Sequence, residues 1–355
     1  MDERWGRLAD ILVNYSTRVR PGERVLITMM EVEARSPLEA VYAAVVKAGG
    51  YPHVQFASAA LERALMLHGS QEQIAWVPEL ERQGMEWADA YVGLRGARNP
   101  NEFANLPADR LVMHRRAMGT ISALRNERTR WVLVRIPNEA FAQQAEMSLE
   151  DMIRMFFGAA LRDWRAEAEA YRQIRDRFQR GETIRVIGHG TDLTFSTRGR
   201  TYVVGDGRNN MPDGEIYTAP IDDSAEGSIT FEFPGVYGGQ RIPGIRLEFE
   251  KGEVVAATAQ ANQELLRQLL AMDDGARRLG EFGVGTNFGI DRFTSEILFD
   301  EKIGGTIHLA MGRAYHECGG ANTSALHWDI VKDLRQEGTV LVDGEVVLER
   351  GQFRL

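Results

Sequence analysis

The first 135 residues alternate between short apolar runs and longer stretches in which apolar residues recur every three or four positions. The short runs are bounded by Pro, Gly or polar residues, as is typical of strands buried on both faces. Strands are predicted at 24–28, 53–56, 90–94 and 131–136. Helices are predicted at 3–19, 36–49, 72–84 and 108–125, with Ser36 as an N-cap. This alternation predicts an α/β N-terminal domain with a mostly parallel, Rossmann-like sheet. No Gly-x-Gly-x-x-Gly follows the first strand, so the pattern does not indicate dinucleotide binding.

A long amphipathic stretch at 148–179 follows this alternation. Ser148 and Asp151 form a capping pattern at its start, and its apolar residues become sparse towards its end. We therefore predict one long helix that links two halves of the chain, with a boundary near Gly181. The predicted domains are residues 1–180 and residues 181–355.

After residue 181 the apolar runs become shorter and alternate with polar positions, which is typical of antiparallel strands. Strands are predicted at 184–187, 193–195, 202–204, 228–233, 245–249 and 253–257. Helices are predicted at 262–272 and 273–279, and the dipeptide Asp343-Gly344 predicts a closing hairpin at 339–348. The second half is therefore predicted to be an α+β, largely antiparallel domain.

Composition narrows the classes of function. The chain has 355 residues, a formal net charge of −9 and one cysteine. An acidic chain is not attracted to nucleic acid or to an anionic membrane surface. The chain contains no run of about 18 apolar residues, so no membrane span is predicted. The N-terminus lacks the apolar run of a signal peptide, and a single cysteine cannot form an internal disulfide. These features predict a cytoplasmic protein.

The stretch at 308–329 is the richest in potential metal ligands, because it contains three of the seven histidines, a tyrosine and an aspartate. Side chains two residues apart in a strand point to the same face, so His327 and Asp329 are predicted to bind one ion together. His308 and Tyr315 are predicted to lie on a strand that runs into a loop. In the middle of the stretch, His316 and Glu317 are interpreted as solvated loop residues and Cys318 as a small buried residue.

Two glutamates beside glycines extend this candidate site. Glu215 follows a Pro-Asp-Gly turn, and Glu281 lies between Gly280 and Gly283. These glycines are interpreted as a tight backbone passage beside a ligand, because no lysine follows as in a phosphate-binding loop. Three carboxylates and two imidazoles exceed the needs of a structural zinc site and suit two divalent ions about 3.5–4 Å apart that share a water. Tyr315 could bind an ion or stabilise a tetrahedral oxyanion.

Four segments carry a resemblance to a known family. They are Asn210–Pro220, Gly280–Asn287, Phe299–His308 and Gly319–Asp329. In these segments the chain resembles the thermophilic aminopeptidases of peptidase family M29, of the aminopeptidase T and aminopeptidase S type. The resemblance covers the second half by motif and the first half by architecture alone.

The resemblance implies a two-domain, homodimeric metallo-aminopeptidase that acts on peptides. It implies two divalent ions, Zn²⁺, Co²⁺ or Mn²⁺, in the second domain. The implied metal ligands are Glu215, Glu281, His308, Tyr315, His327 and Asp329. Of these, Tyr315 and the two glutamates are the implied catalytic residues, and either glutamate could move a proton from water to the leaving amine.

Two alternatives stay open. The chain is also similar to 2,5-dihydroxypyridine dioxygenases, which hold a single Fe(II); their pattern places histidine where Glu281 stands and loses the residues that match Glu215 and His308. A non-catalytic binding protein of the same fold is the other alternative. The interval between Tyr315 and His327 is shorter than in typical peptidase members, which predicts a difference in the substrate pocket.

Overall fold

The computed structural model describes residues 2–354. By its internal contacts the chain divides into two compact units. The first comprises residues up to 162 together with 207–212, and the second comprises 163–206 together with the residues from 213 onward. The domain boundary near Gly181 stays a prediction. No helix within residues 2–354 combines the length and the apolar character that crossing a membrane requires.

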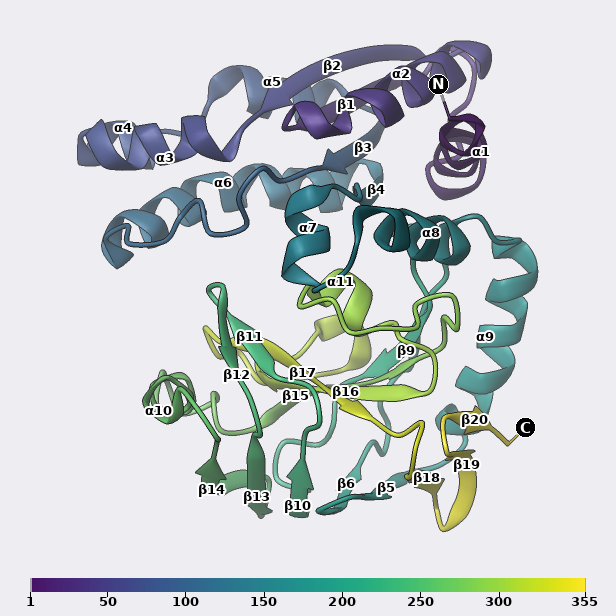
Figure 1. The fold of residues 1–355 in the computed structure, drawn as a ribbon, viewed down its shortest axis with the longest axis vertical. Helices are drawn as coiled ribbons and strands as arrows, with labels where there is room; N and C mark the ends of the chain where they lie inside the picture. Colours follow the sequence, from purple (N-terminus) through teal and green to yellow (C-terminus); the bar gives the residue numbers. More distant parts are fainter. Residues whose placement is uncertain (1, 355) are drawn as a thin grey trace. The chain divides into compact units, whose positions relative to one another are not determined.

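The first unit is built on a five-stranded sheet in the order β2-β1-β3-β4-β8, in which every neighbouring pair is parallel. Its strands are β1 (Arg24–Met30), β2 (Tyr51–Ala57), β3 (Ala90–Arg95), β4 (Arg130–Arg135) and β8 (Asn210–Met211). Its helices are α1 (Glu3–Asp10), α2 (Arg35–Lys47), α3 (Ala59–His68), α4 (Gln71–Ala75), α5 (Glu79–Trp87), α6 (Ala108–Arg128), α7 (Glu139–Gln144) and α8 (Leu149–Ala160). The predicted α/β fold with a mostly parallel sheet is confirmed (Figure 1).

The single helix predicted at 148–179 is wrong. The chain forms two helices, α8 and α9 (Trp164–Gln179), with a break between them. Asp163 causes the new start, because its carboxylate accepts hydrogen bonds from the backbone N–H groups of Arg165 and Ala166. The amphipathic stretch is therefore divided into two helices, because Asp163 caps the N-terminus of the second.

Other predicted helices differ in detail. The helix predicted at 72–84 is divided into α4 and α5, and Pro78 stands just before α5, where the ring is tolerated. After α1 the chain continues as a π-helical segment, Ile11–Ser16. Ser36 is not an N-cap, because α2 already begins at Arg35 after a short 3₁₀ turn.

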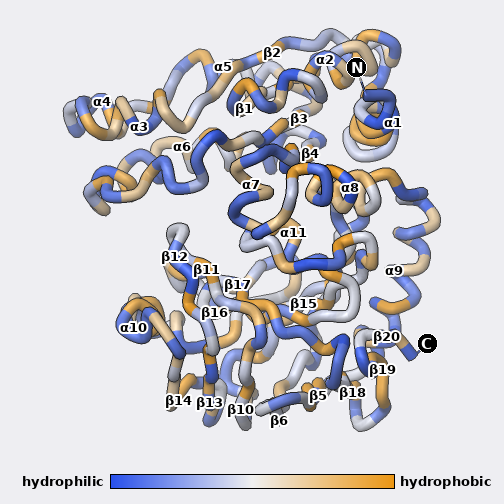
Figure 2. Tube along the Cα trace, viewed as in Figure 1, coloured by the Kyte–Doolittle hydropathy of each residue, from blue (hydrophilic) through white to orange (hydrophobic). Residues whose placement is uncertain are grey.

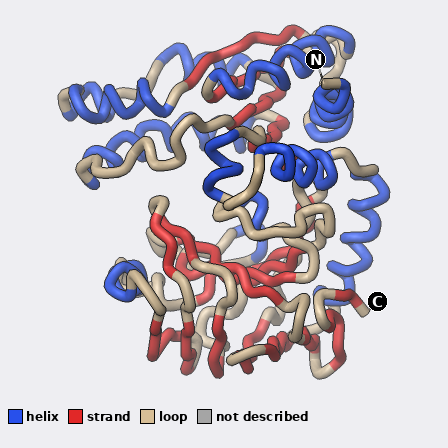
Figure 3. The backbone as a smooth tube through the Cα atoms, in the orientation of Figure 1, coloured by secondary structure: helices blue, strands red, loops and turns tan. Residues whose placement is uncertain are grey.

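The second unit contains two antiparallel sheets and most of the strands of the chain (Figure 3). The eight-stranded sheet has the order β14-β13-β10-β6-β5-β18-β19-β20, and the other sheet, here called the site sheet, has the order β17-β16-β15-β9-β7. The strands of the first are β5 (Thr183–Gly188), β6 (Thr191–Ser196), β10 (Glu226–Thr230), β13 (Arg246–Glu250), β14 (Glu253–Thr258), β18 (Thr339–Val342), β19 (Glu345–Glu349) and β20 (Gln352–Phe353). Those of the site sheet are β7 (Val203–Gly205), β9 (Glu215–Thr218), β15 (Leu279–Gly285), β16 (Thr306–Gly312) and β17 (His327–Asp333). The predicted α+β, largely antiparallel fold is confirmed.

The remaining elements of this unit are the hairpin of β11 (Gly235–Tyr237) and β12 (Gln240–Ile242), helix α10 (Gln263–Leu270) and the short helix α11 (Ile297–Asp300). The hairpin predicted at 339–348 is confirmed, with both Asp343 and Gly344 in the left-handed region. The helix predicted at 273–279 is wrong. Asp273 instead holds a turn there, because its carboxylate accepts hydrogen bonds from the backbone N–H of Gly275 and of Ala325.

Aromatic side chains join the elements of the second unit. Apolar and polar residues alternate along α9 (Figure 2), and its buried positions include Tyr171, Ile174 and Phe178 at helical spacing. The ring of Phe282 on β15 lies 5.1 Å from that of Phe195 on β6 and 6.0 Å from that of Phe178. Phe282 therefore ties the site sheet both to the eight-stranded sheet and to α9.

The substitution Phe282→Ala is expected to lower the free energy of unfolding of the second unit by about 3–5 kcal/mol, because it removes a fully buried ring and leaves a cavity. Denaturant unfolding in the presence of EDTA measures this loss without a contribution from bound ions. The matched control is Phe288→Ala, whose ring is 49% exposed and whose loss should change the stability by less than about 1 kcal/mol. Equal losses in the two variants would contradict the role given to Phe282.

Candidate metal centre

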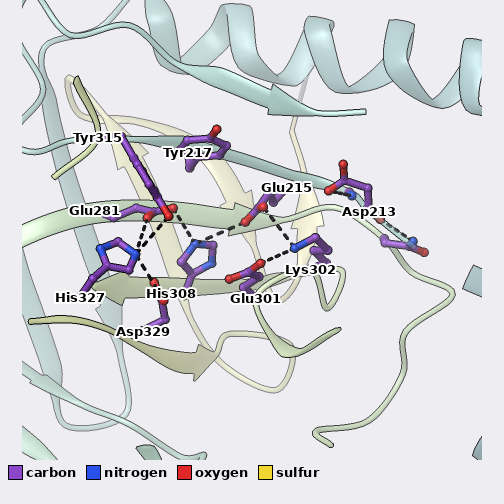
Figure 4. A network of polar contacts seen from close by, with 12 residues as sticks. Asp213, Glu215, Tyr217, Glu281, Glu301, Lys302, His308, Tyr315, His327 and Asp329 are labelled. Carbon is purple, nitrogen blue, oxygen red and sulfur yellow. Dashed lines mark hydrogen bonds and ion pairs between the residues drawn. The ribbon is translucent and has the colours of Figure 1, made fainter. Parts of the chain in front are cut away.

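Four neighbouring strands of the site sheet carry the candidate ligands. Glu215 begins β9, Glu281 lies on β15, His308 on β16, and His327 and Asp329 on β17. The antiparallel register pairs Gly285 with Glu215, Gly283 with His308 and Ala310 with Asp329. The sheet therefore brings together residues that are more than one hundred positions apart in the sequence (Figure 4).

Glycine at position 283 is required by this packing. A Cβ atom there would lie 2.0 Å from Cε1 of His308, which is far inside van der Waals contact. Gly285 is similarly restricted by the carbonyl oxygen of Ile303, at 2.1 Å. The interpretation of Gly283 as part of a tight backbone passage is confirmed, and the space beside it is occupied by the imidazole of His308.

One set of potential ligands consists of Glu281, His327 and Asp329, here called the Asp329 group. Nε2 of His327 lies 3.4 Å from Oε2 of Glu281 and 3.6 Å from Oδ2 of Asp329. Nδ1 of His327 lies 2.7 Å from the carbonyl oxygen of Arg313, a contact that orients the ring and directs Nε2 towards the carboxylates. His327 and Asp329 lie on one face of β17, as their spacing predicted.

A second set consists of Glu215, Glu301 and His308, here called the Glu301 group. Nε2 of His308 lies 3.6 Å from Oε2 of Glu215. Glu301 was not among the ligands predicted from the sequence, although it lies in the segment Phe299–His308 that carries the resemblance. The available signal was a run of three charged residues, Asp-Glu-Lys, directly before a buried strand.

Glu281 connects the two groups. Its Oε1 lies 3.3 Å from Nε2 of His308, and its Oε2 lies 3.4 Å from Nε2 of His327. One carboxylate is thus directed to both imidazoles, one from each group, as a bridging ligand would be.

The buried charges shift one another's pKa values. Burial disfavours the ionised carboxyl of Glu281, but contacts with His308 and His327 outweigh it and lower its pKa to about 2. Burial also disfavours charged imidazoles, yet contact with Glu281 raises the pKa of His308 and of His327 to about 9. Burial raises the pKa of Asp329 to about 6 and that of Glu215 well above its ordinary value. The imidazoles therefore supply part of the positive charge that balances the buried acids of this centre.

Two tyrosines border the centre. The hydroxyl of Tyr315 lies 3.4 Å from Nε2 of His327, and the ring of Tyr217 packs edge-on against that of Tyr315 at 5.8 Å. The Tyr217 hydroxyl donates a 2.7 Å hydrogen bond to the exposed Glu317. Burial and the nearby carboxylates raise the pKa of both phenols, so both remain protonated donors near neutral pH.

The six ligands implied by the resemblance thus lie together, and their role in metal binding stays a prediction. Cys318 is buried beside Ala219 and Ala314, in agreement with its interpretation as a small buried residue.

Two observations show that the side chains of the two groups are suited to bind divalent ions. Oε2 of Glu215 and Oδ1 of Asp329 are buried and have no hydrogen-bond partner within residues 2–354. Buried carboxylate oxygens are rarely left without a partner, so each is suited to bind a cation. In addition, the facing ligand atoms lie 3.3–3.6 Å apart. Tetrahedral coordination at about 2.0–2.2 Å requires a similar separation of ligand atoms.

Comparison with known proteins gives consistent matches over nearly the whole chain. A model of the protein family described as "Thermophilic metalloprotease (M29)" matches residues 1–353. The chain is 25% identical to Aminopeptidase PepS of Streptococcus thermophilus over 380 aligned residues, covering 92% of this chain and 91% of that protein. It is also 25% identical to Aminopeptidase T of Thermus thermophilus over 361 aligned residues, covering 88% and 85%.

Two solved structures share the fold. Wild-type AmpT from Thermus thermophilus superposes with a TM-score of 0.85 at 24% identity, covering 99% of both chains. A 2,5-dihydroxypyridine dioxygenase from Pseudomonas putida KT2440 superposes with a TM-score of 0.61 at 16% identity, covering 99% of this chain and 96% of the other. At these identities both structures show the common fold and not a common activity.

Adding Zn²⁺ or Co²⁺ to the chelator-treated protein is expected to raise its melting temperature, because ions neutralise the buried carboxylates in the folded state alone. At a free ion concentration of one hundred times Kd, the stabilisation is about 2.7 kcal/mol. Differential scanning fluorimetry with and without added ion measures the shift.

The variant His327→Ala should show a much smaller shift, because it removes a ligand of the Asp329 group. Glu248→Gln is the control; this exposed carboxylate pairs with Arg246 on the same strand and should leave the shift unchanged. A full shift in His327→Ala would place ion binding elsewhere in the protein.

Proposed function

The chain belongs to the thermophilic metalloprotease (M29) family, and from this membership we propose that it is a metallo-aminopeptidase that removes N-terminal residues from peptides. The observation that carries the proposal is the arrangement of two ligand groups that meet at the shared carboxylate of Glu281. Relatives that match most of the chain, such as PepS and Aminopeptidase T, are named as aminopeptidases.

We propose that the Asp329 group and the Glu301 group each hold one divalent ion, with Glu281 between them. Zn²⁺, Co²⁺ and Mn²⁺ all suit carboxylate and imidazole ligands. Such a pair supplies a water of lowered pKa for attack on a carbonyl and polarises that carbonyl. On the basis of the family resemblance we also propose a cytoplasmic homodimer.

The residues of the chain have separate tasks in this reaction. The hydroxyl of Tyr315 lies beside His327 of the Asp329 group, where it can donate a hydrogen bond to the substrate carbonyl oxygen as negative charge develops there. Glu215 and Glu281 are the two candidates for taking a proton from the attacking water and returning it to the leaving amine. The carbonyl oxygen of Arg313 orients the imidazole of His327, and this imidazole in turn contacts the hydroxyl of Tyr315 and helps to position it.

The substitution Glu281→Gln is expected to lower kcat/KM for aminoacyl p-nitroanilides by at least about a thousandfold, because it removes the negative charge that faces both ligand groups. Steady-state kinetics measures the loss, and circular dichroism checks that the fold is retained. The control Glu248→Gln should keep its activity.

Full activity of Glu281→Gln would contradict the two-ion assignment. Metal analysis of the purified protein then separates the alternatives. Two zinc, cobalt or manganese ions per chain support the peptidase, one iron supports a ring-cleaving dioxygenase, and no metal supports a binding protein.

Acetylation of the substrate amino group is expected to lower the rate of hydrolysis by at least about a hundredfold, because a site built to bind a free amine rejects an analogue that leaves its polar groups unpaired. The measurement compares matched aminoacyl and N-acetyl-aminoacyl p-nitroanilides over several side chains. Similar rates for both sets would indicate an endopeptidase or esterase-like site instead of an aminopeptidase.

A further inference from the structure

The segment between β16 and β17, residues 313–326, carries Tyr315 and is here called the Tyr315 segment. Two of its polar residues, Asn322 and Ser324, belong to the motif Gly319–Asp329 that carries the family resemblance, yet neither is among the implied metal ligands. Both are buried. Buried polar side chains are held by hydrogen bonds, so the partners of these two residues show what fixes the segment.

The partner of both residues is the turn that precedes β15. Oγ of Ser324 donates a 2.6 Å hydrogen bond to Oδ1 of Asp273, and the backbone N–H of Ala325 donates one of 2.8 Å to Oδ2. The side-chain amide of Asn322 donates a 2.9 Å hydrogen bond to the carbonyl oxygen of Gly275. The Asp273 carboxylate also accepts a 3.1 Å hydrogen bond from the backbone N–H of Gly275, which closes the turn. Asp273 therefore binds its own turn and the Tyr315 segment at the same time.

Close packing accompanies these hydrogen bonds. A Cβ atom at Gly275 would lie 2.3 Å from Oδ1 of Asn322, so the turn approaches the segment as closely as a glycine allows. The hydrogen bond from Ser324 contributes most to lowering the pKa of Asp273, so this carboxylate is ionised near neutral pH. Hydrogen bonds to an ionised acceptor are stronger than those between neutral groups. The turn thus holds residues 322–325 firmly.

The held part of the segment is bonded in turn to the part that carries the tyrosine. The backbone N–H of Ala314 donates a 2.9 Å hydrogen bond to the carbonyl oxygen of Asn322. The backbone N–H of Gly320 donates a 3.1 Å hydrogen bond to the carbonyl oxygen of Tyr315 itself. A series of contacts therefore connects Asp273, through Asn322 and its neighbours, with the backbone on both sides of Tyr315.

We propose that Asp273 is a positioning residue for the aminopeptidase reaction, because its hold on the Tyr315 segment fixes the phenol hydroxyl beside the candidate metal centre. This inference rests on the proposed function. Asp273 belongs to neither ligand group. The hydrogen bond from Tyr315 to the substrate strengthens as negative charge develops, so a displaced hydroxyl should lower kcat and leave KM nearly unchanged.

The first test is hydrogen exchange of the metal-free protein, followed by mass spectrometry. Asp273→Ala is expected to raise the exchange rate of backbone N–H groups in residues 313–326 by at least about tenfold, because it removes several hydrogen bonds to a charged acceptor. Asp343→Ala is the matched control. The Asp343 carboxylate also accepts hydrogen bonds from two backbone N–H groups, those of Glu182 and Thr183, but it lies in the hairpin between β18 and β19. Unchanged exchange of the Tyr315 segment in Asp273→Ala would overturn the proposal.

The second test is steady-state kinetics with aminoacyl p-nitroanilides. Asp273→Ala is expected to lower kcat by at least about tenfold and to leave KM within about threefold, whereas Asp343→Ala should keep both. Asp273→Asn retains one acceptor oxygen for Ser324, so its kcat should lie between those of Asp273→Ala and the unsubstituted protein. A loss in Asp273→Ala that is confined to KM would contradict the positioning of Tyr315.

A double-mutant cycle shows whether Asp273 acts through the tyrosine. Tyr315→Phe removes the hydroxyl and should itself lower kcat. In the Tyr315→Phe protein, Asp273→Ala should then lower kcat by less than about threefold, because residues that act as a unit are not additive. Equal losses with and without the hydroxyl would mean that Asp273 acts on another part of the protein, against the proposal.

Failures of the two proposals are distinguishable. Absence of hydrolysis by the unsubstituted protein with added Zn²⁺ or Co²⁺ would overturn the proposed function, and the hydrogen exchange of Asp273→Ala would still decide whether Asp273 holds the segment. An active protein in which Asp273→Ala keeps its kcat would leave the function intact and overturn the positioning role. If Asp273→Ala does not fold, Ser324→Ala removes one hydrogen bond of the same contact and takes its place in both tests.

Discussion

Concentrated negative charge in a buried place is the constraint on which the second unit depends. Glu215, Glu281, Glu301 and Asp329 gather on and beside the site sheet, and none of their side chains is more than 14% exposed. Ionised carboxylates in such a place need cations, or they take up protons. Two imidazoles and Lys302 supply part of the positive charge in the chain itself. Divalent cations would neutralise the negative charge that remains.

The site sheet makes this concentration possible because strands are rigid and closely spaced. Neighbouring strands place the Cβ atoms of opposite residues about 4.5–5.5 Å apart, so the ends of these side chains can converge on one ion. His308 also needs room that any side chain at position 283 would fill. Phe282, next in the chain, points to the opposite face and packs against Phe178 and Phe195. One strand therefore serves the polar site on one face and the hydrophobic core on the other.

The comparison with the dioxygenase shows that this fold does not by itself decide the chemistry. A chain only 16% identical adopts a similar architecture with a TM-score of 0.61. The side chains that the fold holds, such as Glu281, Glu215 and His308, and not the architecture alone, therefore have to carry the difference in chemistry.

The sequence by itself determined the two fold classes and the order of most strands, because hydrophobic period and turn dipeptides are properties of neighbouring residues. The six residues of the predicted site came from the resemblance of four short segments to family M29. It could not determine the break between α8 and α9, since Asp163 is one acid among many until its cap is formed. Nor could it find Glu301 and Lys302, because their place in the centre depends on their proximity to Glu215, which is far away in the chain. The stretch at 308–329 looked self-sufficient in sequence, yet its histidines are balanced by acids from β9 and β15. Only the register of the site sheet decided which charges face one another, because electrostatic interactions act through distance in space and not along the chain.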